Sequence, residues 1–226
     1  MWSYYGSKCK LAKLYPEAKY PTIVEPFAGA AWYSVLHRHK QVILNESYDV
    51  IYAIWKWLIT SAAPEEILRY VNLYLGQNIS TLPLPEPHKD LIGYIINRGC
   101  TRPANIVTKW SCQSQARPTW ASTPYSQLTR IARLLPEIKH WTITYGDYSE
   151  LPNIQATWFI DPPYQFGGKF YPEHNINYPD LAKWCKSRKG QVIVCENSQA
   201  TWLDFKPLAI NTGQRKTTTE MMWYKI

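Results

Sequence analysis

One short stretch of the sequence combines residue types that can bind and activate an amino group. The apolar run 158–160 ends on Asp161, and Pro162, Pro163 and Tyr164 follow directly. The Asp161 carboxylate and the Pro162 carbonyl are two hydrogen-bond acceptors, and proline holds its carbonyl stiffly because its ring fixes φ. They would bind both hydrogens of a planar amine and draw its nitrogen toward tetrahedral geometry, while the Tyr164 ring would stack on a base turned out of its helix. A rigid polar loop explains the prolines but not the combination, so we interpret this stretch as a catalytic site.

Three further segments carry polar or flexible residues where predicted strands end. Gly29 lies between a predicted strand, 22–27, and a predicted helix, 29–39, where glycine lets the backbone approach a ligand. Glu46 ends a second predicted strand, and an acid there can accept both hydroxyls of a ribose. Asp147 ends a third and can accept from an exocyclic amine. Each has an ordinary interpretation as well: a tight turn at Gly29, an acid favoured by a helix dipole at Glu46, and a cap of the next turn at Asp147.

The elements that must position these residues alternate between strands and helices at both ends of the chain. The predicted strands cover 22–27, 41–46, 140–147, 156–161, 190–197 and 217–226, and the predicted helices 29–39, 47–60 and 178–188. Such alternation predicts a mostly parallel α/β sheet with crossover helices. In an open sheet of this kind ligands bind at the carboxyl ends of the strands.

The middle of the chain has a different character. It contains predicted helices over 64–76, 90–99 and 124–138, a Pro-rich turn over 82–90, and no strong strand pattern. Residues 97–141 carry seven Lys and Arg against one acid, which gives +6 of the chain's net charge of +8. We therefore predict a sheet domain of residues 1–60 and 141–226, interrupted by a basic, mostly helical insertion of residues 61–140.

Composition narrows the class of protein and of partner. The net charge of +8 favours an anionic partner, either nucleic acid or an anionic membrane surface, and 11 Trp and 17 Tyr offer rings for stacking. No apolar stretch approaches the roughly 20 residues of a membrane span, and the first residues lack the apolar core of a signal peptide. The five cysteines are scattered without a C-x-x-C pair, which favours a reducing compartment and argues against structural zinc.

The order of these motifs resembles that of Dam-type DNA adenine methyltransferases. The motifs that carry the resemblance are Tyr5-Gly6-Ser7-Lys8, Glu25-Pro26-Phe27-Ala28-Gly29, Asn45-Glu46, Gly146-Asp147-Tyr148 and Asp161-Pro162-Pro163-Tyr164, with "VIVCENS" and "TEMMWYK" near the end of the chain. The resemblance covers residues 2–60 and 141–226. It implies a Rossmann-like methyltransferase sheet, mostly parallel with an antiparallel C-terminal strand. The insertion would be the target-recognition region, since 96–99 resembles its start.

The resemblance also implies roles for individual residues. Tyr5, Gly6 and Lys8 would line the methionine end of S-adenosylmethionine, and Glu25, Pro26, Phe27, Ala28 and Gly29 would hold its amino acid and sulfonium region. Glu46 would bind the ribose, and Asp147 and Tyr148 would contact the adenine of the cofactor. Asp161, Pro162, Pro163 and Tyr164 would hold the target adenine. The cofactor would leave as S-adenosylhomocysteine, and no metal is expected.

Two departures from the family pattern concern the cofactor loops. Ser7 stands where the family often has a second glycine before the lysine, and Ala30 and Ala31 stand where it often has glycines. Both make the backbone near the cofactor less permissive.

Basic residues are the predicted contacts to DNA phosphates, although a solvated basic surface would have the same composition. The candidates are Lys8, Arg98, Arg102, Lys109, Arg117 and Lys169. Gly167 and Gly168 are the expected hinges of a flap that orders on DNA.

The expected activity is site-specific methylation of adenine N6 in double-stranded DNA. A methyltransferase acting on cytosine N4, an RNA adenine or a glutamine amide would use the same acceptor geometry, and a catalytically inactive DNA-binding module would keep the fold. We expect a monomer, without a membrane partner, in the cytoplasm of a bacterium or of the host of a phage that encodes it. The sequence leaves open the target site and whether a cognate restriction endonuclease is a partner or the enzyme acts alone.

Overall fold

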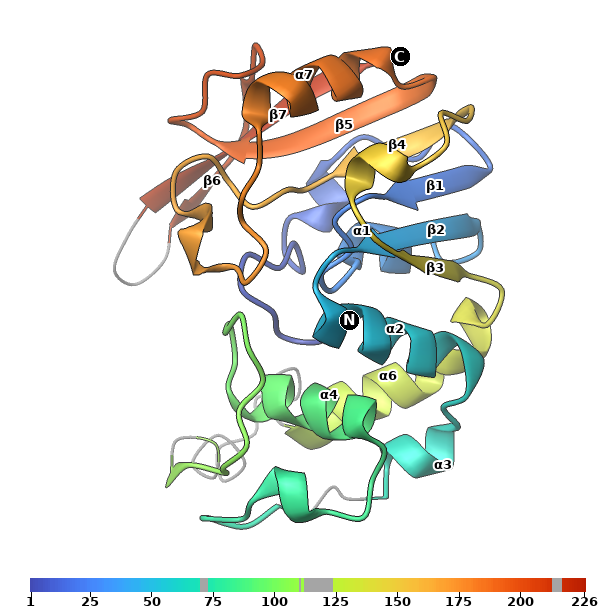
Figure 1. The fold of residues 1–226 in the computed structure, drawn as a ribbon, viewed down its shortest axis with the longest axis vertical. Coiled ribbons are helices and arrows are strands. Elements are labelled where there is room, and N and C mark those ends of the chain that lie inside the picture. Colours follow the sequence, from blue (N-terminus) through green and yellow to red (C-terminus); the bar gives the residue numbers. More distant parts are fainter. Residues whose placement is uncertain (70–72, 110, 112–123, 213–216) are drawn as a thin grey trace. The chain divides into compact units, whose positions relative to one another are not determined.

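The computed structural model describes residues 1–69, 73–109, 111, 124–212 and 217–226, which form two compact units (Figure 1). The helical unit comprises Met1–Ser7 and Asp49–His140, and the sheet unit comprises Lys8–Tyr48 and Trp141–Ile226. The chain therefore passes between the units after Ser7, Tyr48 and His140. The predicted domains had the boundaries 60/61 and 140/141, and they assigned residues 1–7 and 49–60 to the sheet domain.

Within the described residues of the sheet unit, seven strands form one sheet in the order β3-β2-β1-β4-β5-β7-β6. The strands are β1 (Thr22–Glu25), β2 (Gln41–Glu46), β3 (Thr142–Tyr145), β4 (Ala156–Ile160), β5 (Gly190–Asn197), β6 (Lys206–Thr212) and β7 (Thr217–Lys225). Pairing from β3 through β5 is parallel, and β7 pairs antiparallel with both β5 and β6. This topology confirms the predicted fold class, a Rossmann-like methyltransferase sheet that is mostly parallel with an antiparallel C-terminal strand.

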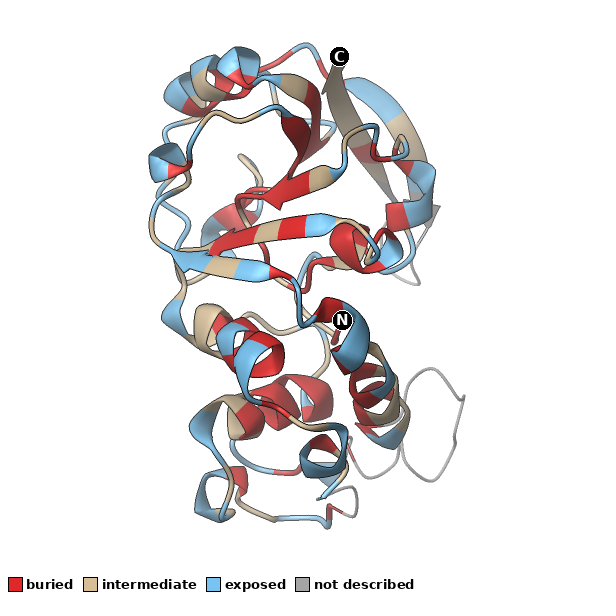
Figure 2. Cartoon of the chain, turned by 90° about the vertical axis from the view of Figure 1, so that its right-hand side faces the viewer, coloured by how far each residue is buried: buried red, intermediate tan, exposed pale blue. Residues whose placement is uncertain are grey.

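Helices cover both faces of this sheet. The described part of this unit contains η1 (Ala12–Leu14), α1 (Trp32–Leu36), η3 (Tyr148–Glu150), η4 (Gly168–Phe170) and α7 (Tyr178–Ser187), of which α1 and α7 lie on opposite faces. On β4, Trp158 and Ile160 enter a buried cluster with residues of α7, whereas Phe159 points to the other face. There it stacks on Tyr33 of α1 at a ring-centroid distance of 4.3 Å and meets the edge of Tyr15 at 5.0 Å. Burial on both faces explains why β4 is apolar throughout rather than alternating, and the buried strands appear in red in Figure 2.

A buried amide fixes the N-terminal part of the sheet unit against the centre of the sheet. The side-chain oxygen of Gln191 on β5 accepts hydrogen bonds from the Lys19 amide and the Thr157 hydroxyl, both at 2.8 Å. Its amide nitrogen donates to the Glu17 carbonyl at 2.9 Å. These bonds hold residues 17–19 on the α1 face, and with them Tyr15 and the chain that precedes it.

The helical unit consists of α2 (Asp49–Thr60), α3 (Pro64–Ile67), η2 (Ile79–Thr81), α4 (Glu86–Ile96) and α6 (Pro124–Ile138) in the residues described. Helix α2 packs against α4 and α6, and Trp55 on α2 packs on Trp2 at a ring distance of 5.2 Å. This packing is why residues 49–60 belong to the helical unit. None of the described helices is long and apolar enough to cross a membrane.

Three elements differ from the predicted ones. The helix expected over 64–76 ends at Ile67. Residues 70–72 lie outside the described residues, and residues 76–79 bond to residues 105–107, as in the 2.9 Å bond from the Gly76 amide to the Val107 carbonyl. Helix α4 begins inside the predicted Pro-rich turn, since a proline in the first helical turn needs no N–H partner. Strand β6 was not predicted: it lies at the sheet edge, and its register with β7 shifts near Pro207.

Gly190, at the start of β5, provides a test of the sheet packing. Its φ is +93°, and a Cβ there would lie 2.4 Å from the Ala156 carbonyl oxygen of β4. We expect Gly190→Ala to lower the free energy of unfolding by about 3 kcal/mol or more in urea titrations, because strand β4 would have to move. Gly167→Ala is the matched control, with a φ of +104° and no atom within 4 Å of the added carbon; it should cost only about 1–2 kcal/mol. Equal losses would contradict this packing.

Candidate active site

The parallel strands bring the predicted site loops to one edge of the sheet. The carboxyl ends of β1, β2, β3 and β4 share this edge because all four strands run in the same direction. The strand order reverses between β1 and β4, and such a topological switch point is where open α/β sheets bind ligands. The loop 25–29 follows β1 and the loop 161–164 follows β4, so the two segments predicted for cofactor and target flank the switch point.

The loops after β1, β2 and β3 are joined by the buried side chain of Asn45. Its amide nitrogen donates to the Pro26 carbonyl at 3.2 Å and to the Gly146 carbonyl at 3.0 Å. The Ala28 amide in turn donates to the Asn45 carbonyl at 3.0 Å. The structure therefore brings together three of the four segments predicted to hold the cofactor.

Glu46 links the end of β2 to the loop after β1. One carboxylate oxygen accepts from the Gly29 amide at 3.0 Å, and the other accepts from the Ser47 and Tyr48 amides, both at 3.1 Å. Burial raises the pKa of Glu46, while these three N–H groups oppose the shift. A carboxylate offers about four acceptor sites, so Glu46 retains capacity for a further donor. Gly29 has a φ of 45°, so the tight-turn interpretation holds there too.

Glu25 points into the interior of the unit. It is 2% exposed, and its carboxylate accepts the Ser34 amide of α1 at 2.7 Å. Burial raises its pKa to about 7, and the bonds to Ser34 oppose the shift. In this structure Glu25 fixes the position of α1, and the cofactor contact predicted for it stays a prediction.

The remaining cofactor candidates divide between the two units. Phe27 packs on Tyr148 at a ring distance of 5.3 Å. Asp147 is exposed and caps η3, accepting from the Ser149 amide at 2.9 Å and from its hydroxyl. Tyr5 belongs to the helical unit, where its amide donates to the Cys100 carbonyl at 3.2 Å. Gly6 belongs to that unit too and has a φ of 69°.

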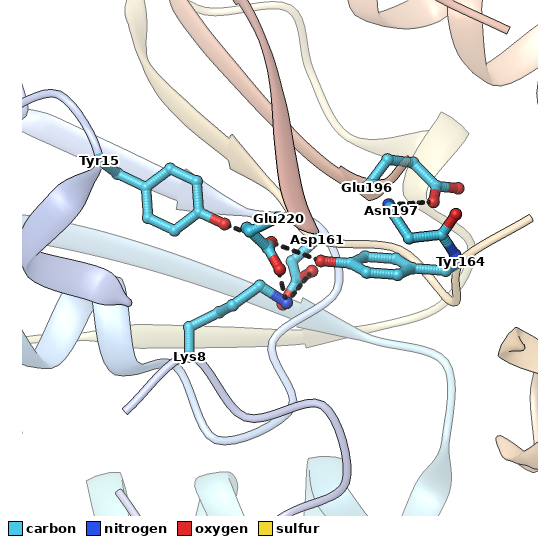
Figure 3. A network of polar contacts seen from close by, with 7 residues as sticks. All are labelled: Lys8, Tyr15, Asp161, Tyr164, Glu196, Asn197 and Glu220. Atoms are coloured by element: carbon cyan, nitrogen blue, oxygen red, sulfur yellow. Dashed lines mark hydrogen bonds and ion pairs between the residues drawn. The ribbon is translucent and has the colours of Figure 1, made fainter. Parts of the chain in front are cut away.

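Asp161 lies in a buried group of charged and phenolic side chains that we call the charge cluster: Lys8, Tyr15, Asp161, Tyr164 and Glu220 (Figure 3). The Lys8 ammonium is 2.7 Å from Asp161 Oδ1 and 3.7 Å from Glu220 Oε1. Glu220 Oε1 also accepts from the hydroxyls of Tyr15 and Tyr164, each at 2.6 Å. The Lys8 ammonium lies 4.8 Å from the centre of the Tyr164 ring, so ring, ammonium and carboxylates hold one another in place.

The charge cluster is unbalanced toward negative charge. One ammonium and two carboxylates carry a formal charge of −1. Burial lowers the pKa of Lys8, but Asp161 and Glu220 outweigh burial and leave it above its ordinary value, so Lys8 is charged. Burial raises the pKa of Asp161 to about 6, with Lys8 opposing and Glu220 adding to the shift. At pH 7 Asp161 is therefore mostly ionised, and its side chain, 21% exposed, remains accessible to a ligand.

Glu196, at the end of β5, anchors the loop that follows Asp161. Its carboxylate accepts the Gln165 amide at 2.6 Å and the Trp202 indole N–H at 3.2 Å. The Pro163 carbonyl accepts the Tyr178 hydroxyl at 2.8 Å. Of the residues that the structure describes, none donates a hydrogen bond to the Pro162 carbonyl. The acceptor predicted to pair with Asp161 is thus available on a loop that is held from both sides.

The basic residues predicted to bind DNA differ in exposure. Arg102, Lys109 and Lys169 are exposed, Arg98 is half-buried, Lys8 belongs to the charge cluster, and Arg117 lies outside the described residues. Two other cations of the insertion bind the backbone: Arg130 donates to the Met1 carbonyl, and Lys139 donates to those of Leu58 and Ala62. Part of the insertion's charge therefore stabilises the helical unit.

Three residues of this site were not assigned roles from the sequence: Tyr15, Glu196 and Glu220. Glu196 and Glu220 lie in the two C-terminal motifs noted above, each as the single acid of its strand. An acid on a strand that is mostly buried needs hydrogen-bond partners, and that was the available signal. Tyr15 carried none, because it is one tyrosine among 17.

No protein-family model matches the chain, and no curated protein sequence is similar to it. Among solved structures it is similar to the rRNA methyltransferase AviRa from Streptomyces viridochromogenes. The identity is 13%, the match covers 89% of this chain and 76% of that one, and the TM-score is 0.36. A likeness at this level carries no conclusion about substrate.

The raised pKa of Glu25 gives a prediction for stability against pH. Between its unfolded pKa, near 4.5, and its folded pKa of about 7, the folded state keeps a proton that the unfolded state has lost. The contribution of Glu25 to stability therefore falls as pH rises through this window. Glu25→Gln removes this contribution. Between pH 4 and pH 8 the free energy of unfolding of the variant should therefore fall less than that of the wild type, by about 3 kcal/mol.

Denaturant unfolding across this pH range measures the difference. Glu17→Gln, at an exposed position of the same unit, should reproduce the wild-type slope. A Glu25→Gln slope equal to that of the wild type would contradict the account.

Proposed function

We propose that this chain transfers a methyl group from S-adenosylmethionine to the amino nitrogen of an adenine in duplex DNA. The observation that carries the proposal is the Asp161 carboxylate. It lies beside the topological switch point, remains 21% exposed, and belongs to a buried cluster with a net charge of −1. Such a site favours a ligand atom that becomes positively charged, as an amine does when it is alkylated.

The loops at the same edge fit the cofactor in their chemistry. Glu46 keeps acceptor capacity for a ribose hydroxyl, and the tight turn at Gly29, with a φ of 45°, lets the backbone come close to a ligand. Glu46, Ala28 and Gly29 would hold the cofactor there. When bound, S-adenosylmethionine supplies an electrophilic methyl group on a cationic sulfur and leaves as S-adenosylhomocysteine.

Asp161 and the Pro162 carbonyl have the task of making the amine a better nucleophile. The lone pair of an adenine amino group is delocalised into the ring, which makes the nitrogen a weak nucleophile. Accepting both of its hydrogens draws the lone pair toward the nitrogen. As the new N–C bond forms, the nitrogen becomes cationic, and its interaction with the Asp161 carboxylate strengthens in the transition state. The proton then leaves to water, and adenine N6 is neutral again.

Lys8 has to give up part of its contact with Asp161 for this to happen. Its ammonium lies 2.7 Å from Asp161 Oδ1. The cationic nitrogen of the methylated amine would be stabilised by the same carboxylate, so the two cations compete for it. Glu220 Oε1 is 3.7 Å from the same ammonium and is already held by two tyrosine hydroxyls. When the target amine binds Asp161, Lys8 shifts to Glu220, so the buried ammonium never lacks a counter-ion.

The choice of adenine and of DNA rests on the sequence motif and on charge. Asp-Pro-Pro-Tyr is the feature that resembles adenine methyltransferases, and the exposed Arg102, Lys109 and Lys169 are suited to phosphate contacts. The inactive-module alternative is disfavoured because Asp161 and Glu46 are both present at the edge where ligands bind.

The direct test is to incubate the protein with radiolabelled S-adenosylmethionine and unmethylated DNA, RNA or protein in parallel. We expect label in DNA only, and a loss of about 1,000-fold or more in Asp161→Ala with little change in cofactor affinity. Asp204→Ala, which removes an exposed acid of the same unit, should transfer normally. Label in RNA or protein but not in DNA would replace the proposal with one of its alternatives. Full activity of Asp161→Ala would contradict the mechanism.

Glu220→Gln tests the shift of Lys8. Glutamine can still accept the two tyrosine hydroxyls but no longer neutralises Lys8, so Lys8 should remain on Asp161. We expect kcat to fall by about 100-fold with cofactor affinity unchanged. Tyr15→Phe is the matched control, because it removes one hydroxyl bond to Glu220 and keeps the carboxylate; its kcat should stay within a few-fold of wild type. A wild-type kcat in Glu220→Gln would refute the shift.

A further inference from the structure

A basic groove on the sheet unit is not used by the mechanism above. The cavity measures about 580 Å³ and lies between the residues of η1 and those of α1. The side chains that give it its character are Lys10, Lys13, Trp32, Leu36 and Arg38. Cys9 also lines the groove, and in the sequence it directly follows Lys8 of the charge cluster.

Among the described residues that line the groove, three are cations and none is an acid. Lys10 and Lys13 are both exposed, and neither forms an ion pair with a carboxylate of the described residues. Two lysine charges that share one concave surface attract an anion. The cofactor does not meet this requirement, since its sulfonium is itself cationic.

The rest of the lining provides a rigid apolar wall. Trp32 is half-buried and Leu36 is 46% exposed, so an indole ring and an aliphatic chain stand beside the cations. The backbone at Arg38 is held by the Trp141 indole, which donates to its carbonyl at 3.3 Å. The volume falls in the range of about 300–1,000 Å³ common for pockets that take small organic groups. The groove thus suits a ligand with a negative charge at one end and a flat or apolar body.

We infer that the groove binds one nucleotide of the DNA strand, an inference that rests on the proposed function. The phosphate would contact Lys10, Lys13 and Arg38, and the base or sugar would lie against Trp32. Combining a cationic track with an aromatic ring is how proteins hold single nucleotides without reading their sequence. Contacts to DNA would then come from the sheet unit as well as from the insertion, and they would position the strand rather than specify it.

The test is the salt dependence of DNA binding, measured by fluorescence anisotropy with a labelled duplex of about two helical turns. Each lost phosphate contact lowers the slope of log affinity against log salt by about 0.9. For the double variant Lys10→Gln, Lys13→Gln we therefore expect a slope smaller by about 2 and a raised KM for DNA at unchanged kcat. The control is Lys183→Gln, Lys206→Gln, which removes the same charge from exposed positions of the same unit and should keep the wild-type slope.

The outcomes separate this inference from the proposed function. An unchanged slope in the Lys10, Lys13 variant, or an equal drop in the control, overturns the groove assignment, while methyl transfer to DNA by the wild type would still stand. A wild-type protein that neither binds nor methylates DNA overturns both. A smaller slope in the groove variant alone supports the groove as a phosphate contact.

Discussion

The interaction on which the site depends is the burial of one ammonium between two carboxylates. Moving such charges out of water costs several kcal/mol per ion unless each finds a partner, and the chain supplies partners from distant segments. Lys8 comes from the N-terminal part of the sheet unit, Asp161 from the end of β4, and Glu220 from β7. Glu220 reaches the edge because β7 runs antiparallel and pairs Glu220 with Asn197, the last residue of β5. Without the antiparallel strand β7, the site would therefore lack Glu220.

Local patterns in the sequence were sufficient to predict the centre of the fold. Strands β1, β4 and β5 are mostly buried and β2 is partly buried, so each contains a short apolar run, and each was predicted. The pattern failed where tertiary contacts override local preference. Residues 76–79 pair with residues 105–107 and so cannot continue the helix expected over 64–76. Strand β6 escaped prediction because an edge strand with an internal proline and an exposed residue such as Ile210 lacks the buried pattern. Helix α2 was predicted correctly as a helix, but its partners α4 and α6 could not be read from its own sequence.

The site was predictable where chemistry is local and not where it is assembled across the fold. Asp161, Pro162 and Tyr164 are adjacent in sequence, and Glu46 follows a strand of recognisable pattern, so both were identified as candidates. The pairing of Lys8 with Asp161 joins residues from opposite ends of the chain, and nothing near either residue signals it. Glu25 shows the opposite case. It is the last residue of β1, as Glu46 is of β2, yet its carboxylate lies in the interior and accepts a peptide N–H of α1. Position at a strand end indicates where a side chain lies but not which way it points.

The central claim is that the Asp161 site delivers a methyl group to adenine N6, and the identity of the acceptor atom tests it most directly. DNA carrying ¹⁵N in its adenine amino groups can be incubated with trideuteromethyl S-adenosylmethionine and the protein, then digested to nucleosides for mass spectrometry. We expect one product, N6-methyl-2′-deoxyadenosine, in which the trideuteromethyl group and the ¹⁵N label occur in the same base fragment. A trideuteromethyl group on cytosine, or on no base at all, would contradict it.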